Sequence, residues 1–143
     1  MTENREGLPL ILIVEDNRDS RELLIKVLSA RGYRIAEAVD GEEALQRITA
    51  ERPALVLMDI SIPKIDGLEV TRIVKRQEHL KDIPIIALTA HAMKGDREKA
   101  LQAGCDGYIP KPVNVRELPE QIKAFIKNGL VLTCMVAGQV FWG

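Results

Sequence analysis

Charged side chains follow three apolar runs of the sequence. These side chains are Glu15 and Asp16 after residues 10–14, Asp59 after residues 55–58, and Lys111 shortly after residues 107–109. A carboxylate at the end of a buried strand costs free energy unless another group pairs with it, so these acids need partners. If the strands are parallel neighbours, three carboxylates and one ammonium gather at one edge of a sheet. Such a cluster is typical of a site for a divalent cation and a phosphate group.

The rest of the chain alternates between strand and helix patterns. Apolar runs predict strands at residues 10–14, 34–39, 55–58, 85–88 and 108–109. Apolar residues at helical spacing, with Asn17 and Asp40 as capping residues, predict helices at residues 17–31, 40–52, 68–74, 96–103 and 115–127. The inward stripe of the first helix is predicted to be Leu23, Leu24, Val27 and Leu28. This alternation predicts an α/β fold with a doubly wound sheet and helices on both faces.

Binding sites in such folds form at the carboxyl ends of the strands, near the point where the strand order reverses. The polar residues that stand just past predicted strand ends are Glu15, Asp16, Asp59, Thr89 and Lys111. One of them alone is usually a helix cap or a solvated loop residue. Their corresponding positions in four separate strand units indicate a shared site.

Composition and charge exclude several classes of protein. The 143 residues suit one domain, and 20 basic against 21 acidic residues leave a net charge of −1, so nothing favours nucleic acid or an anionic membrane as a partner. Cys105 and Cys134 lack metal-ligand spacing and are predicted to be reduced thiols. No signal-type segment opens the chain, and the apolar residues 130–137 are too few to span a bilayer, so we expect a cytoplasmic protein.

Four motifs together are typical of one family. They are Val14-Glu15-Asp16-Asn17, residues 57–63 (LMDISIP) with Asp66-Gly67, Leu88-Thr89-Ala90, and Lys111-Pro112. Through them the chain resembles the receiver domain of two-component response regulators, over about residues 9–127. The resemblance implies a flavodoxin-like fold, a five-stranded parallel sheet with five helices. It leaves residues 1–8 as an N-terminal extension and 128–143 as an apolar tail whose role is open: a docking segment, an aggregation-prone strand or non-native residues.

The resemblance also implies a role for each polar residue. Asp59 would accept a phosphoryl group from a sensor histidine kinase or a histidine phosphotransfer protein, assisted by Lys111 and Thr89. Mg²⁺ would be held by Asp16, Asp59 and the backbone carbonyl of Ser61, with Glu15 acting through water. Thr89 and Tyr108 would form the conformational switch. Such a protein is no enzyme beyond its own phosphorylation and dephosphorylation.

Elementary physics supports these roles. A carboxylate attacks a phosphorus surrounded by anionic oxygens only when the charge is neutralised, and Mg²⁺ with a fixed ammonium does this. Mg²⁺ keeps several waters and needs only one or two direct carboxylates, which suits Asp16 and Asp59.

Two points stay open, and several residues are expected to be structural. The chain is predicted to be a stand-alone regulator that contacts a downstream protein target; the alternatives are an excised receiver of a hybrid histidine kinase and a non-phosphorylated receiver that acts as a binding module. The Lys111-Pro112 peptide is cis or trans. His79 and His91 are predicted to be surface residues. Arg72, Lys75 and Arg76 are predicted to form a solvated basic face.

Overall fold

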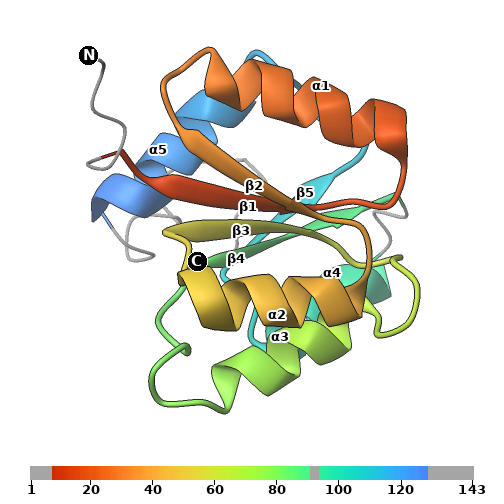
Figure 1. Ribbon diagram of the computed structural model, residues 1–143. Coiled ribbons are helices and arrows are strands. Elements are labelled where there is room, and N and C mark those ends of the chain that lie inside the picture. The colour runs from red at the N-terminus through yellow and green to blue at the C-terminus, as the bar shows by residue number, and fades with distance from the viewer. Residues whose placement is uncertain (1–7, 91–93, 129–143) are drawn as a thin grey trace.

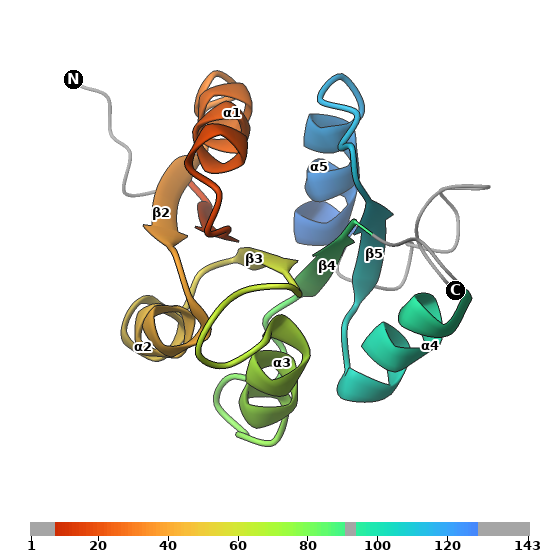
Figure 2. The same ribbon diagram turned by 90° about the vertical axis from the view of Figure 1, so that its right-hand side faces the viewer.

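The computed structural model describes residues 8–90 and 94–128. In this part of the chain strands and helices alternate in the order β1 (Leu10–Val14), α1 (Arg18–Ser29), β2 (Arg34–Ala38), α2 (Gly41–Glu51), β3 (Leu55–Asp59), α3 (Gly67–Lys75), β4 (Ile85–Thr89), α4 (Lys94–Ala103), β5 (Gly107–Pro110) and α5 (Leu118–Asn128). The strands form one parallel sheet in the order β2-β1-β3-β4-β5. Helices α1 and α5 cover one face, and α2, α3 and α4 cover the other (Figures 1 and 2). The predicted doubly wound, flavodoxin-like fold is confirmed.

The register of the sheet aligns the carboxyl ends of the strands. Val14 of β1 pairs with Met58 of β3, and the next residue in each segment is an acid: Glu15, which follows β1, and Asp59, which ends β3. On the other side of β3, Asp59 pairs with Leu88, and Thr89 of β4 pairs with Pro110 of β5. The strand order reverses between β1 and β3, where such folds place their binding sites. The predicted site residues therefore meet at one edge of the sheet.

Alternating side chains of each strand supply two cores. Leu12 and Val14 of β1 belong to the core under α2, α3 and α4, whereas Ile11 and Ile13 belong to the core under α1 and α5. This alternation follows from the period of two of a β-strand. Because the central strands are apolar on both faces, the sheet is a fixed platform for the loops that carry the polar residues.

Side-chain caps fix the start of three helices. The backbone N–H groups of Ser20, Glu43 and Glu69 donate to the side-chain oxygens of Asn17, Asp40 and Asp66, at 2.8, 2.8 and 2.9 Å. The caps predicted at Asn17 and Asp40 are confirmed. Such a cap contributes roughly 1 kcal/mol. Each cap also anchors the end of the loop that precedes its helix.

Two helices differ from their predicted form. Leu23 was predicted to face inward but is 49% exposed, because the buried stripe of α1 runs through Leu24 and Leu28. Helix α5 begins at Leu118 rather than at residue 115. The Asn114 side chain accepts hydrogen bonds from the backbone N–H groups of Arg116 and Glu117, and this arrangement holds residues 115–117 in a turn.

Lys75 does not belong to a solvated basic face, and that prediction is wrong for this residue. Its ammonium donates to the carbonyl oxygens of Lys81 and Ile83 at 2.9 and 2.8 Å and to Oδ2 of Asp106 at 2.8 Å. Oδ2 of Asp106 also accepts from the Ile85 N–H at 2.9 Å. Arg72 and Arg76 are exposed, as predicted. Lys75 thus joins α3 to the segments that precede β4 and β5, near the amino ends of these strands.

We predict that Lys75→Met lowers the free energy of unfolding by about 2–3 kcal/mol, because it leaves a largely buried carboxylate and two carbonyl oxygens without their cation. The matched control is Lys81→Met, which removes an exposed ion pair with Glu78 and should change stability by less than about 0.5 kcal/mol. Urea unfolding of both variants measures the difference. Equal losses would contradict a structural role for Lys75.

Candidate functional site

The candidate site lies at the carboxyl edge of the sheet. Glu15 follows β1, Asp59 ends β3, Thr89 ends β4 and Lys111 follows β5. Glu15 and Asp59 are only 1% and 4% exposed, whereas Asp16 is exposed. The structure therefore brings together the acids and the cation that the sequence predicts to be neighbours, and it leaves one acid facing solvent.

Lys111 is the cation shared by the two buried acids. Its Nζ lies 2.8 Å from Oε1 of Glu15 and 3.0 Å from Oδ2 of Asp59. These two acids lie 96 and 52 residues away from Lys111 in the sequence, so only the folded sheet can form the triad. The second oxygen of each acid accepts from the backbone: Oε2 of Glu15 from the Asn17 N–H at 3.0 Å, and Oδ1 of Asp59 from the Ser61 N–H at 2.9 Å. Both carboxylates are held at both oxygens.

Burial and charge shift the titration of this triad. Burial raises the pKa of Glu15 above its ordinary value; the Lys111 ammonium and the Asn17 N–H oppose this, and the Asp59 carboxylate adds to it. For Lys111, burial acts to lower the pKa, but the hydrogen bonds and charges of Glu15 and Asp59 outweigh it, and the pKa is raised. Lys111 therefore stays charged at neutral pH.

The acids also fit a metal ion. One carboxylate oxygen from each of Glu15, Asp16 and Asp59 lies within 4.8 Å of the others. Three hard oxygen donors, one of them exposed, are the donor set that Mg²⁺ and Ca²⁺ prefer, and zinc is disfavoured because neither sulfur nor imidazole is among these donors. A single ammonium does not balance three carboxylates. The excess of negative charge attracts a divalent cation to this site.

Thr89 and Tyr108 lie beside this edge in adjacent strands. Both are buried, and the Tyr108 ring is part of the core under α2, α3 and α4. The pKa of Tyr108 is raised, first by burial and then by the Asp96 carboxylate; the Arg97 guanidinium and the Thr89 side chain oppose this shift. The Thr89 carbonyl accepts from the Lys111 N–H at 2.7 Å, which ties the end of β4 to the residue that carries the ammonium. The Lys111-Pro112 peptide is cis.

Four other expected features remain: the Ser61 carbonyl, His91, the apolar tail and His79. Ser61 is exposed, and its N–H binds Asp59; its predicted metal ligand, the backbone carbonyl, stays a prediction. His91 and the apolar tail lie outside the described residues. His79 is exposed, as predicted.

Arg21 is a site residue that the sequence interpretation missed. Its guanidinium donates from Nη1 to the Glu15 carbonyl oxygen and from Nε to Oε1 of Glu37, both at 2.9 Å. A charged residue on a surface helix is normally expected to be solvated. Both partners of Arg21 lie outside α1, so helical spacing does not indicate them. The only available signal was its place, one turn into the helix that follows the acid pair.

A small apolar hollow adjoins the triad. It has a volume of about 170 Å³ and is lined by Glu15, Ser20, Leu23, Leu24, Lys111, Pro112 and Val113. The exposed Leu23 is one of its walls, so this apolar side chain faces the hollow and not the core. The hollow gives the charged site an apolar border.

Comparison with known proteins places this geometry in a family context. The family model described as the response regulator receiver domain matches residues 11–123. The polar-differentiation response regulator DivK of Brucella anthropi is 44% identical over 116 residues, which are 81% of this chain and 94% of that protein.

Two solved structures have the same fold. The receiver domain of the sensor histidine kinase PA1611 of Pseudomonas aeruginosa, which holds a magnesium ion in its active-site cleft, is 38% identical, with a TM-score of 0.79 over 85% of this chain and 99% of that one. A CheY-like receiver domain protein of Methanospirillum hungatei is 32% identical, with a TM-score of 0.79 over 85% and 96%. Among the described residues, no helix has the length and apolar character needed to cross a membrane.

The raised pKa of Glu15 predicts a pH-dependent effect of Glu15→Gln. Because the folded-state pKa lies above the unfolded value, the contribution of Glu15 to stability is complete below the unfolded pKa and is lost as pH rises through the folded pKa. Glutamine has nearly the same shape as glutamate but does not ionise, so the variant does not lose this stability as the pH rises. The free energy of unfolding of Glu15→Gln, relative to the unsubstituted protein, should therefore rise as the pH increases above the ordinary pKa of a glutamate, about 4.5, in metal-free buffer.

Glu22→Gln is the control for this pH series. Glu22 is exposed, and its pKa is lowered by a hydrogen bond from Arg18, so its contribution is lost as pH falls and any trend has the opposite sign. Denaturant unfolding at several pH values measures both variants. If the free energy of unfolding of Glu15→Gln, relative to the unsubstituted protein, stays constant or falls as the pH rises, the raised pKa of the buried Glu15 carboxylate is contradicted.

Proposed function

Because this chain belongs to the family of response regulator receiver domains, we propose that Asp59 is the residue on which it accepts a phosphoryl group from a phosphohistidine. The observation that supports this assignment is the placement of Asp59: it is buried at the carboxyl edge, 3.0 Å from the Lys111 ammonium, and its oxygen lies within 4.8 Å of those of Glu15 and Asp16. A phosphoacceptor role in two-component signalling is what this family and its relatives have in common. The reaction moves a phosphoryl group from nitrogen to a carboxylate oxygen.

We assign the metal site to Mg²⁺. Asp16 and Asp59 would be direct ligands, with the Ser61 backbone carbonyl as a third, and Glu15 would act through a water. The three oxygen donors and the exposure of Asp16 support this set, since Mg²⁺ keeps several waters on its open side. When bound, Mg²⁺ supplies neutralisation of the charge on the phosphoryl oxygens.

The chain's own residues then orient and neutralise the reactants. Ser61 N–H and Lys111 each hold one oxygen of Asp59, so the carboxylate is aimed before the donor arrives. One Asp59 oxygen forms a bond to phosphorus while the bond from phosphorus to the donor imidazole breaks. The Lys111 ammonium offsets negative charge on the transferred group as a point charge. The Thr89 hydroxyl donates to one of its oxygens.

Thr89 and Tyr108 would couple this event to the surface. Both side chains are buried in adjacent strands, and Tyr108 packs in the core on which α4 lies. A phosphoryl oxygen on Asp59 would attract the Thr89 hydroxyl. The movement of Thr89 would change the surroundings of the Tyr108 hydroxyl. Rearrangement of the α4 and β5 surface is the proposed signal to a downstream protein.

The phosphoryl donor would be a sensor histidine kinase or a histidine phosphotransfer protein. The apolar hollow beside Lys111, with Leu23 and Val113 in its walls, supports contact with a protein donor, because an apolar partner side chain there excludes water from the transfer. The cytoplasm is the proposed location. The alternative of a receiver that only binds and takes no phosphate is not favoured, since the acids, the lysine and the threonine of the acceptor site are present together.

We predict that Asp59→Asn abolishes stable phosphorylation by acetyl phosphate and leaves the fold intact. The substitution removes the nucleophile and one negative charge but keeps the shape of the side chain. Intact-mass analysis after incubation with acetyl phosphate and Mg²⁺ measures uptake, and circular dichroism checks the fold. Asp66→Asn is the control, because Asp66 only caps α3 and asparagine caps equally well. Uptake by Asp59→Asn at the level of the unsubstituted protein would sink the assignment.

We also predict that Asp16→Asn weakens Mg²⁺ binding about tenfold or more, whereas Asp66→Asn changes it less than about twofold. Asp16 contributes an oxygen to the acid cluster, and Asp66 uses its Oδ1 to accept from the Glu69 N–H. Isothermal titration with MgCl₂ measures both affinities. Equal losses would show that general negative charge, and not coordination by Asp16, binds the ion.

A further inference from the structure

Arg21 is the best-anchored arginine next to the acid cluster. Its side chain is 15% exposed, and its guanidinium bridges the Glu15 carbonyl oxygen and the Glu37 carboxylate at 2.9 Å each. Arg18, one turn earlier in α1, has a side chain that is 80% exposed and pairs with Glu22 on the surface. The two arginines lie on the same helix and carry the same charge. Of the two, only Arg21 makes a hydrogen bond to the backbone of the segment that contains Glu15 and Asp16.

The contact with the Glu15 carbonyl fixes one particular peptide. That carbonyl belongs to the peptide bond that joins Glu15 to Asp16. The same turn is held on its other sides by the Glu15 N–H, which donates to the Ala38 carbonyl at 3.0 Å, and by the Asn17 N–H, which donates to the Glu15 carboxylate. With Arg21 in place, the peptide bonds before and after Asp16 each make one hydrogen bond.

The Asp16 carboxylate has no such support of its own. Within residues 8–90 and 94–128, no hydrogen bond or ion pair reaches it, and the residue is exposed. Its direction toward the other two acids therefore depends on the backbone that carries it. A rotation of the preceding peptide moves the Asp16 oxygen away from those of Glu15 and Asp59.

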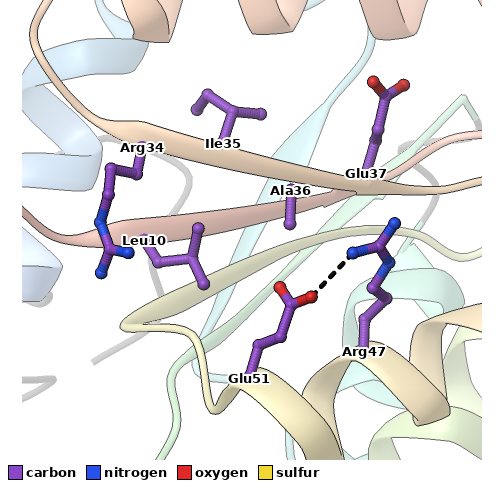
Figure 3. A pocket seen from close by; sticks show the side chains of 7 residues that line it. All are labelled: Leu10, Arg34, Ile35, Ala36, Glu37, Arg47 and Glu51. Carbon is purple, nitrogen blue, oxygen red and sulfur yellow. Dashed lines mark hydrogen bonds and ion pairs between the residues drawn. The ribbon is translucent and has the colours of Figure 1, made fainter. Parts of the chain in front are cut away.

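Glu37 holds the guanidinium in place. Figure 3 shows the Glu37 carboxylate on the opposite side of β2 from the ion pair of Arg47 and Glu51. It points toward the face that α1 covers, where it accepts from Nε of Arg21. A planar guanidinium can serve two acceptors in fixed directions at once, which a lysine ammonium on a flexible stem does less well.

We infer that Arg21, held in place by Glu37, is a positioning residue for the metal site. Through its hydrogen bond to the Glu15 carbonyl, Arg21 sets the direction of the Asp16 side chain. This inference rests on the proposed Mg²⁺ site. Charge alone makes the opposite prediction, because a cation near three acids repels Mg²⁺ and its removal should tighten binding. The sign of the change in affinity therefore separates positioning from simple electrostatics.

The test is Mg²⁺ titration calorimetry at constant ionic strength on the full chain and on Arg21→Ala, Arg21→Lys, Glu37→Gln and Arg18→Ala. We expect Arg21→Ala to bind Mg²⁺ about tenfold more weakly, the usual scale for loss of an outer contact that orients a ligand. Arg21→Lys, which can reach one acceptor, and Glu37→Gln should lie between Arg21→Ala and the unsubstituted protein. Arg18→Ala should bind as tightly as the unsubstituted protein or slightly more tightly.

Phosphorylation by acetyl phosphate gives a second measurement. For Arg21→Ala the Mg²⁺ concentration at half-maximal rate should rise about tenfold, while the rate at saturating Mg²⁺ returns to within about twofold, since Arg21 does not touch the phosphoryl group. A merely destabilised protein would lose rate at all Mg²⁺ concentrations. If Arg21→Ala does not fold by circular dichroism, Arg21→Lys and Glu37→Gln carry the test, and binding by both equal to that of the unsubstituted protein overturns the inference.

The outcomes separate the two proposals. If the unsubstituted protein binds Mg²⁺, Asp16→Asn loses it, and Arg21→Ala binds equally or more tightly, the positioning role is overturned and the metal site stands. If the unsubstituted protein does not bind Mg²⁺, the metal assignment and the inference both fall. A loss for Arg18→Ala equal to that for Arg21→Ala also overturns the positioning role, because it assigns the effect to a general disturbance of α1 and not to the contact between Arg21 and the Glu15 carbonyl.

Discussion

The interaction on which the rest of the site depends is the Lys111 ammonium between the Glu15 and Asp59 carboxylates. Strand β5 is separated from β1 by β3 and β4, a distance of about 14 Å at the usual spacing of strands. The Lys111 stem alone does not cover this distance. The Lys111 N–H bonds to the Thr89 carbonyl, which places Lys111 beside the end of β4. The Glu15 and Asp59 side chains contact its ammonium from the ends of β1 and β3.

This pairing leaves the site with an excess of negative charge. One ammonium serves two buried carboxylates, and a third, Asp16, lies close by and faces solvent. Burial, to which the Asp59 carboxylate adds, raises the pKa of Glu15, so the ionised form of this acid is destabilised in the folded chain. Functional sites commonly retain such a cost because a fully compensated cluster would have no affinity for a ligand cation. The helix caps and the buried strands supply the stability that the acids do not.

The fold and most of the site could be predicted because their signals are local. Buried runs of four or five apolar residues mark β1, β3 and β4, and an acid or a hydroxyl at the end of such a run is conspicuous. Parallel pairing then brings these ends together without further information. Asn17 and Asp40 could be recognised as caps from the residues that follow them. These predictions need only the periodicity of strands and helices.

The residues that escaped prediction have partners that only the folded chain supplies. Helical spacing shows on which face Lys75 lies, but not that two loop carbonyls and Asp106 meet it there. Arg21 binds a carbonyl six residues away and a carboxylate 16 residues away on β2. Leu23 and Leu24 are adjacent and equally apolar, and only the placement of α1 on the sheet decides which of them is buried. Charged residues on helices are therefore where sequence interpretation is weakest.

The two lysines near opposite ends of the sheet lie in surroundings of different charge balance. Near the amino ends of the strands, Lys75 meets one carboxylate and two carbonyl oxygens, and its three donors are all used. Charge there is balanced within the chain, and a cation would gain nothing. Near the carboxyl ends, Lys111 meets two carboxylates with a third beside them, and the local charge stays negative. The same residue type balances the charge at one end of the sheet and leaves an excess of negative charge at the other, which a divalent cation could neutralise in the proposed phosphoryl transfer.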